Sequence, residues 1–66
     1  MHIGKSIRVA LAMREKNQKW LSEKLGVSTA YVSALCTNNT TAGTGAIKRI
    51  SEALDFSVSE FVALGE

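Results

Sequence analysis

The sequence contains no proline and only one cysteine, and aromatic residues make up just 6% of the chain. Without proline, no residue forces a break in a helix. The lone Cys36 cannot form an internal disulfide, and one thiol cannot supply a structural zinc site. No apolar run is long enough to cross a membrane, and residues 1–11 lack the order of regions typical of a signal peptide. We therefore expect a cytoplasmic protein.

Residues with catalytic chemistry are scarce as well. One histidine, one cysteine and scattered carboxylates form no recognisable catalytic set. We expect no enzymatic activity, no cofactor, no metal, no membrane partner and no small-molecule ligand. The length of 66 residues predicts one domain over residues 1–66 with a modest core. The content of 45% hydrophobic and 21% charged residues is typical of a globular protein rather than a disordered chain.

The eight basic residues are distributed unevenly. All of them lie in residues 1–49, where only two acidic residues oppose them, so this part carries a net charge of +6. Residues 50–66 carry four acidic residues and no base, which gives −4. A basic body with an acidic end is suited to presenting one face to a polyanion such as DNA, although an ordinary solvated surface produces the same counts.

The spacing of apolar residues predicts five helices and no sheet. We expect helices over residues 3–15, 18–25 and 29–37, then a fourth after a loop over residues 39–45, and a short fifth that begins at Ser57. The alternation of apolar and polar residues over 56–59 is also compatible with a strand. A helix is the preferred interpretation, because residues 60–64 break that alternation.

Helix boundaries are indicated by capping residues. Asn17 and Ser28 are suited to begin the second and third helices, and Ser57 with Glu60 has the spacing of a capping box. Gly26 is suited to the left-handed conformation that ends a helix. The side chains expected to face inward in the last four helices are Leu21, Leu25, Tyr31, Val32, Leu35, Ile47, Ile50, Ala53, Leu54, Val58, Phe61 and Val62.

Residues 18–37 predict two short helices that meet at a tight glycine turn. The segment has a glutamine, a leucine, a small residue, a second leucine, the turn glycine and three later apolar positions: Gln18, Leu21, Ser22, Leu25, Gly26, Val27, Val32 and Leu35. This pattern resembles the helix-turn-helix of the phage repressor and Cro family, which usually has alanine in place of Ser22. Apolar residues of the other three helices also fit, so the resemblance covers nearly the whole chain.

The resemblance implies a five-helix, phage-repressor-like, all-α fold whose helix over residues 29–37 docks in the major groove of double-stranded DNA. It also implies a sequence-specific transcriptional regulator, most simply a Cro-type or repressor-type protein of phage or prophage. DNA-binding antitoxins and controllers of restriction systems share the fold and stay open as alternatives. A third alternative is a protein-interaction adaptor that kept the fold and lost DNA binding.

The expected recognition helix is unusual because residues 29–37 contain no charged residue and no glutamine. Bidentate contacts to bases are therefore not available to it, and we expect methyl groups to meet thymine methyls while hydroxyls form single hydrogen bonds. Phosphate contacts are expected at the two helix starts, where Gln18 and Ser28 alternatively act only as caps. The full set of predicted DNA contacts is Gln18, Lys19, Ser28, Thr29, Ala30, Ser33, Ala34, Thr37, Asn38, Asn39, Thr40 and Lys48.

The acidic end of the chain has more apolar residues than a short last helix must bury. Because two-fold symmetric operators are bound by two-fold symmetric proteins, we expect a homodimer through this end. The predicted interface residues are Phe56, Val58, Phe61, Val62 and Leu64.

Trp20 lies in the expected helix over residues 18–25 but is not part of its inward pattern. We expect its indole to lie across Lys16.

Overall fold

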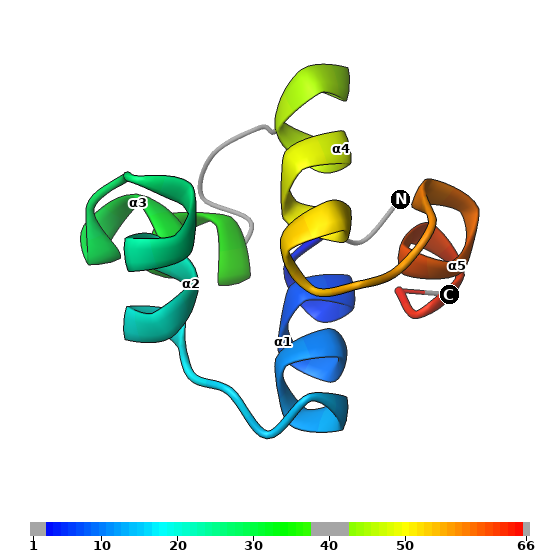
Figure 1. Cartoon of the computed structure of the whole chain (residues 1–66), viewed down its shortest axis with the longest axis horizontal. Coiled ribbons are helices and arrows are strands. Elements are labelled where there is room, and N and C mark those ends of the chain that lie inside the picture. Colours follow the sequence, from blue (N-terminus) through cyan, green and yellow to red (C-terminus); the bar gives the residue numbers. More distant parts are fainter. Residues whose placement is uncertain (1–2, 38–42, 66) are drawn as a thin grey trace.

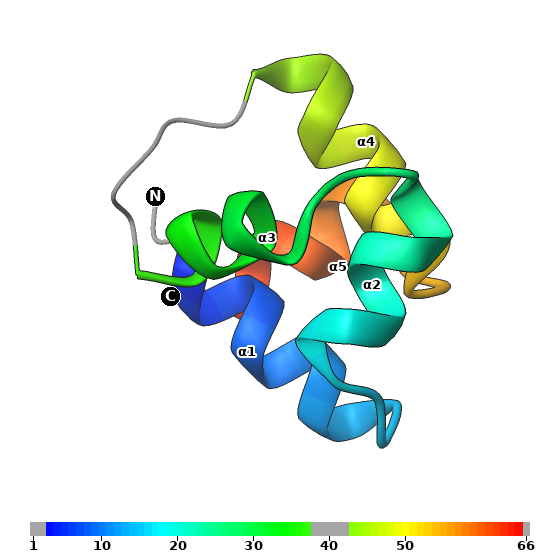
Figure 2. The same ribbon diagram turned by 90° about the vertical axis from the view of Figure 1, so that its left-hand side faces the viewer.

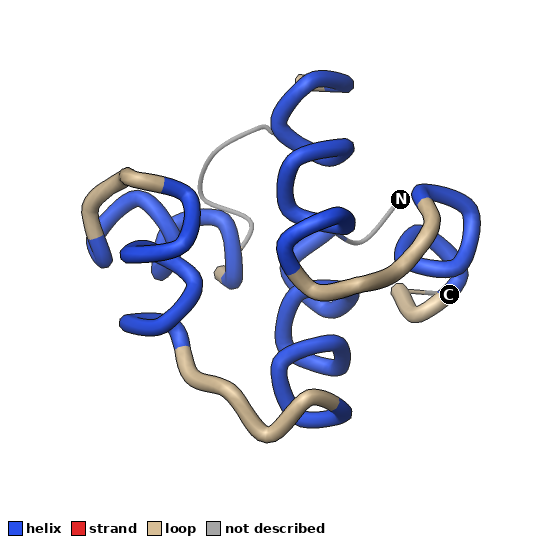
Figure 3. Tube along the Cα trace, in the orientation of Figure 1, coloured by secondary structure: helices blue, strands red, loops and turns tan. Residues whose placement is uncertain are grey.

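The computed structural model describes residues 3–37 and 43–65, and over these residues the chain is all-helical (Figure 1). The helices are α1 (Ile3–Met13), α2 (Gln18–Leu25), α3 (Thr29–Cys36), α4 (Thr44–Ala53) and α5 (Val58–Ala63). Loops join them, with no strand in the described ranges (Figure 3). The prediction of a five-helix, all-α fold is confirmed. The alternative of a strand over residues 56–59 is wrong, because α5 begins within that segment.

α1 and α4 occupy the middle of the molecule, with α2 and α3 on one side and α5 on the other (Figure 1). The view from the α3 side agrees, since α3 lies in front of α5 there (Figure 2). α3 packs on α1 and α2, while α5 packs on α1 and α4. α3, the predicted recognition helix, and the predicted dimer surface at α5 therefore lie on opposite sides of a molecule whose longest extent is 25 Å (Figure 1). No helix of the described part is long and apolar enough to cross a membrane.

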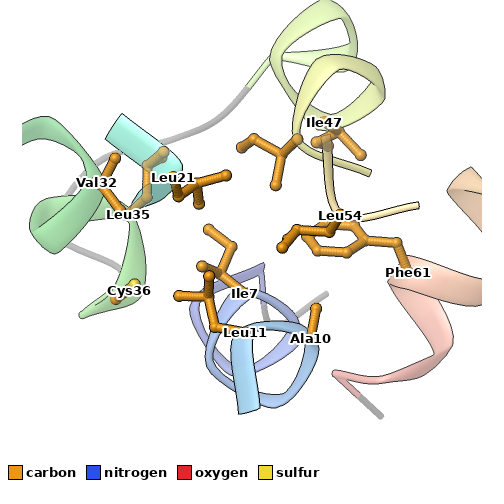
Figure 4. Close-up of a cluster of buried hydrophobic side chains, with 11 residues drawn as sticks. Ile7, Ala10, Leu11, Leu21, Val32, Leu35, Cys36, Ile47, Leu54 and Phe61 are labelled. Carbon is orange, nitrogen blue, oxygen red and sulfur yellow. The ribbon is translucent and has the colours of Figure 1, made fainter. Parts of the chain in front are cut away.

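The core is one cluster of apolar side chains to which every helix contributes (Figure 4). Each valine, leucine, isoleucine or phenylalanine side chain of this cluster stabilises the fold by about 1.5–3 kcal/mol when fully buried. The cluster thereby fixes all five helices relative to one another. Its largest fully buried apolar members are Ile7, Leu21, Val32, Leu35, Ile50, Leu54 and Phe61.

Three predicted helix caps are confirmed. The Asn17 side chain accepts a hydrogen bond from the backbone N–H of Trp20 at 2.8 Å, and Ser28 accepts one from Tyr31 at 3.1 Å. At the start of α5, both bonds of the Ser57–Glu60 capping box are present. Each cap satisfies a backbone donor that would otherwise have no partner in its helix.

α1 ends at Met13 rather than at residue 15. Glu15 adopts a left-handed conformation with φ of 56°, and Asp55 does the same after α4 with φ of 62°. A left-handed residue cannot continue a right-handed helix, so α1 ends before the predicted residue 15. In both turns a residue without glycine's conformational freedom takes the position that glycine usually occupies.

Three local expectations from the sequence are wrong. The loop expected to continue to Gly45 ends earlier, because Gly43 is the N-cap of α4 and the helix begins at Thr44. Tyr31 is exposed, since Val32, Leu35 and Cys36 form the buried face of α3 and Tyr31 lies about 100° from Val32 around the helix axis. Val58 is 43% exposed, because α5 contacts the core through Phe61 further along the helix.

Arg14 connects the end of α1 to the turn between α4 and α5. Its Nε donates to the carbonyl of Leu54 at 2.9 Å, and its Nη2 donates to that of Asp55 at 2.9 Å. The guanidinium also lies 4.2 Å from the centre of the Phe56 ring. Carbonyls at the end of a helix lack partners within it, so Arg14 caps α4 and covers Phe56 at once.

The α5 capping box makes stability depend on pH. Hydrogen bonds from Ser57, chiefly from its backbone N–H at 3.1 Å, hold the pKa of Glu60 below its ordinary value. A carboxyl with a depressed pKa in the folded state stabilises fully above its unfolded pKa, about 4.3. This contribution is lost as the pH falls through the lower folded value.

Between about pH 5 and pH 3, we expect the melting temperature of Glu60→Gln to fall less than that of the parent protein. Glutamine keeps an acceptor for the Ser57 N–H but does not titrate, so the geometry of the box is retained. Thermal unfolding followed by circular dichroism at each pH measures the difference. Equal losses in the two proteins would contradict a role for this carboxylate in the acid response.

Candidate nucleic-acid interface

The angle between α2 and α3 is fixed by buried side chains at their crossing. Leu21 is fully buried, Val32 and Leu35 face it from α3, and Ser22 is only 4% exposed. The Ser22 hydroxyl donates to the backbone carbonyl of Lys19 at 2.7 Å. A serine is tolerated in this close contact because its polar group has a partner within its own helix.

The turn between the two helices has the geometry that the sequence predicts. Gly26 has φ of 71° and ψ of 33°, which is the left-handed region. The backbone N–H of Val27 bonds the carbonyl of Ser22 at 3.0 Å, and the N–H of Gly26 bonds that of Glu23 at 3.3 Å. This pair of bonds forms a Schellman motif, which ends α2 and turns the chain sharply into α3.

The face of α3 that points away from the core is uncharged. Thr29, Ala30 and Ser33 are exposed on it, whereas Ala34 is only half-buried. These side chains share one side of the helix because they are three or four residues apart. The surface therefore offers small methyl and hydroxyl groups and lets another molecule approach the helix backbone closely.

The hydroxyl of Thr37 is already engaged. Its Oγ1 donates to the backbone carbonyls of Ser33 and Ala34, each at 3.2 Å. A hydroxyl has a single proton, so this group retains only acceptor capacity toward a partner. Thr37 is exposed as expected for a DNA-contact residue, but it is not a free donor in this conformation.

The two predicted phosphate sites at helix starts differ. Asn17 caps α2, which leaves Gln18 half-buried as the first helical residue with its amide uninvolved in the cap. Ser28 caps α3 by accepting a hydrogen bond, so its own proton remains available to an incoming acceptor. Capping and phosphate contact are thus compatible at Ser28, while the interpretation of Gln18 as a cap is wrong.

The basic residues fall into two groups. Arg14 is bonded to the end of α4, and Arg49 donates from Nη2 to the carbonyl of Leu25 at 2.8 Å. The predicted contacts Lys19 and Lys48 are exposed on α2 and α4. The carbonyls that hold Arg14 and Arg49 are neutral, so both arginines keep their positive charge, but their side chains are anchored and cannot move freely toward a phosphate.

Arg8 is a candidate contact that sequence reasoning missed. Burial raises the pKa of the Cys36 thiol, and the positive charge of Arg8 lowers it in part. The Arg8 side chain is exposed on α1, the helix that packs against α3. The only signal in the sequence was its position one residue after the buried Ile7, which does not reveal the neighbouring helix.

The raised pKa and the burial of Cys36 make its thiol unreactive.

Trp20 lies where the sequence predicts. The Lys16 ammonium is 5.3 Å from the centre of its ring, and the half-buried indole also packs against the core. A cation over a ring face stabilises by about 0.5–1 kcal/mol at an exposed site.

The predicted DNA contacts Asn38, Asn39 and Thr40 lie outside the described residues.

The predicted dimer residues are partly accessible. Val58 is the most exposed at 43%, and Phe56, Val62 and Leu64 are half-buried. Phe61 is fully buried within the core, so its side chain has no surface to offer a second copy. The remaining four residues form the accessible apolar surface of this end.

Comparison with known proteins adds an independent finding to this geometry. A family model described as Helix-turn-helix matches residues 7–61. The matched residues begin in α1, include the α2–turn–α3 unit and end in α5. No curated protein and no solved structure gave a match.

Proposed function

The chain belongs to the helix-turn-helix family of the XRE type, whose members are DNA-binding transcriptional regulators, and we propose that it is a Cro-like or repressor-like protein of phage or prophage that docks α3 in the major groove. The observation that carries this proposal is the exposed face of small side chains on α3, held by a buried crossing with α2. A rigid helix with small outward side chains fits deeply into a groove. Exposed lysines on the neighbouring helices supply the attraction to phosphates.

Two other roles fit the same fold. An antitoxin or a controller of a restriction system would use the α3 face in the same way, and its neighbouring genes would identify it. A protein-interaction adaptor is favoured by one specific observation, the absence of any charged residue in α3. The exposed basic residues on the other helices favour the DNA-binding role instead.

Selection from a pool of random-sequence duplexes tests the proposed function. We expect enrichment of a two-fold symmetric site whose half-site centres are about one helical turn apart. Binding is then measured by fluorescence anisotropy on the enriched duplex and on a scrambled one. Absence of enrichment together with weak, equal binding to both duplexes would favour the adaptor role.

Methyl groups on α3 should read thymine in the selected site. Replacing a contacted thymine with uracil removes only its methyl group, and we expect a loss of about 1 kcal/mol, roughly fivefold in Kd. Anisotropy titrations on duplexes with one replacement each measure the loss position by position. If uracil binds as well as thymine at every position, methyl readout by Ala30 and Ala34 is wrong, and preference arises from DNA shape.

Association through the α5 end completes the proposed regulator. A single small head makes few contacts, whereas two copies related by a two-fold axis bind both half-sites. Two copies that meet at α5 place their α3 helices at the far ends of the pair. With a longest extent of 25 Å per copy, that arrangement accommodates the separation of about 34 Å that one turn of DNA requires.

We expect Val58→Asp to raise the dimer dissociation constant at least about tenfold, because the contact would bury an unpaired charge. Val58 is the first residue of α5, where an acidic side chain favours the helix, so the fold should survive. Leu64→Asp should act in the same direction. Sedimentation equilibrium measures both. Unchanged association in both variants would move the interface elsewhere, and a strict monomer on DNA would refute the dimer.

A further inference from the structure

A small hollow lies where the end of α2, the start of α3 and the middle of α4 meet. Its volume is about 210 Å³, and it is lined by Leu25, Val27, Tyr31, Ala46, Arg49 and Ile50. Five of these six side chains are apolar or aromatic, and Ile50 belongs to the buried core. The hollow is therefore an apolar recess in the surface with a single charged group in its wall.

That charged group is held in a fixed place. The Arg49 guanidinium donates from Nη2 to the carbonyl of Leu25 at 2.8 Å, which anchors α4 to the end of α2. A guanidinium has five N–H donors, and this bond occupies one of them. Within the described residues Arg49 makes no other hydrogen bond or ion pair, so most of its donors have no protein partner, and the side chain lines the hollow.

We propose that this hollow binds a small apolar carboxylate, a single ring or a short branched chain that ends in one acid group. The apolar part would occupy the recess, and the carboxylate would receive paired hydrogen bonds from Arg49, whose planar donors match its two oxygens. The ligand is small because the volume is below the range of about 300–1,000 Å³ that holds drug-sized molecules. An apolar wall with one anchored cation selects against neutral and cationic compounds of the same shape.

The surroundings of the hollow favour a small molecule over a docked protein. Beyond Arg49 the surface continues into a more open recess that includes Lys24 and Glu52, which are exposed and charged. Of the large apolar side chains exposed in the described part, only Tyr31 belongs to the hollow. A protein partner needs roughly 1,000 Å² of complementary surface, and this rim does not provide an apolar area of that kind.

The proposal does not depend on DNA binding, because the hollow is a feature of the folded monomer. It also has a consequence for the helices. An occupant would contact Tyr31 of α3 and Ala46 of α4 together, and it would stabilise their arrangement by binding only the folded state.

Benzoate and benzamide form a matched pair of probes, since they share a ring and differ in charge. We expect benzoate to shift the backbone amide NMR signals of Val27, Ala46 and Ile50 in the ¹⁵N-labelled protein, with a Kd on the order of 1 mM. Benzamide should bind at least about tenfold more weakly, because it lacks the charge-assisted hydrogen bonds. Shifts spread over the exposed lysines, or equal binding of the two probes, would overturn the proposal.

Two variants separate the apolar and charged contributions. Ala46→Leu places a larger side chain into the hollow while keeping a good helix former, and it should abolish benzoate binding with the fold intact. Arg49→Gln removes the charge and should bring benzoate down to the affinity of benzamide. Binding that persists in Ala46→Leu would overturn the site. Signals of the hollow that move on dilution of the protein without probe would show a second copy as the occupant and would also overturn it.

Discussion

Replacing Ala30 with aspartate is expected to weaken DNA binding at least about a hundredfold, or roughly 3 kcal/mol, without unfolding the protein. Ala30 is exposed in the first turn of α3, on the face proposed to enter the groove. A carboxylate there would lie among phosphates and base edges with no cation on α3 to pair with it. An acidic side chain near a helix start interacts favourably with the helix dipole, so α3 itself should be slightly stabilised.

Ser59→Asp is the matched control for this change. Ser59 occupies the same second position in α5 and is exposed, and α5 lies on the opposite side of α1 and α4 from α3 (Figure 1). Because Ser59 neighbours the predicted interface residue Val58, sedimentation equilibrium must first show that this variant associates like the parent. The two variants have the same net charge, so a general electrostatic penalty would affect them equally. We expect the control to bind within about threefold of the parent. Equal losses in both variants would show that net charge, rather than the position of α3, explains the effect.

The affinity for DNA should fall by roughly a thousandfold between 50 and 200 mM salt if each dimer neutralises about six phosphates. We expect the exposed lysines and Arg8 to supply this attraction, while Arg14 is engaged with the carbonyls of Leu54 and Asp55. The slope of log affinity against log salt reports how many counterions are released. Anisotropy titrations at four or more salt concentrations measure it.

Two variants that each remove one positive charge test which basic residues contact phosphates. Lys19→Gln should reduce the magnitude of the slope by about one for each phosphate that this side chain no longer neutralises. Arg14→Gln should leave the slope unchanged, because that guanidinium already caps α4, although thermal stability should fall. A flat salt response in the parent protein would sink the phosphate-dominated mechanism and support the adaptor role.

Local features of the fold could be predicted because their physical causes lie within one helical turn. The caps at Asn17, Ser28 and Ser57 each join a side chain to a backbone group three residues away. The left-handed turn at Gly26 and the contact of Trp20 with Lys16 also involve near neighbours in the chain. Helical periodicity identified most of the core for the same reason, since it reflects the geometry of single helices.

Errors occurred where the packing of several helices decides the outcome. Periodicity assigned Tyr31 to the buried face of α3, but contacts with α1 and α2 bury Cys36 instead. It assigned Val58 and Phe61 together, whereas only Phe61 enters the core. Two residues that share one side of a helix differ in burial when the neighbouring helices cover only part of that side.

The sequence by itself determined the five helices, their caps, the glycine turn and the uncharged character of α3, because these follow from local hydrogen bonding and the spacing of apolar residues. Only the tertiary structure decided that Arg14 and Arg49 serve the fold, since their acceptors lie 40 and 24 residues away in the chain. The hollow beside Arg49 also arises only where three elements meet. Contacts between distant segments depend on how helices cross, and no local pattern encodes that geometry.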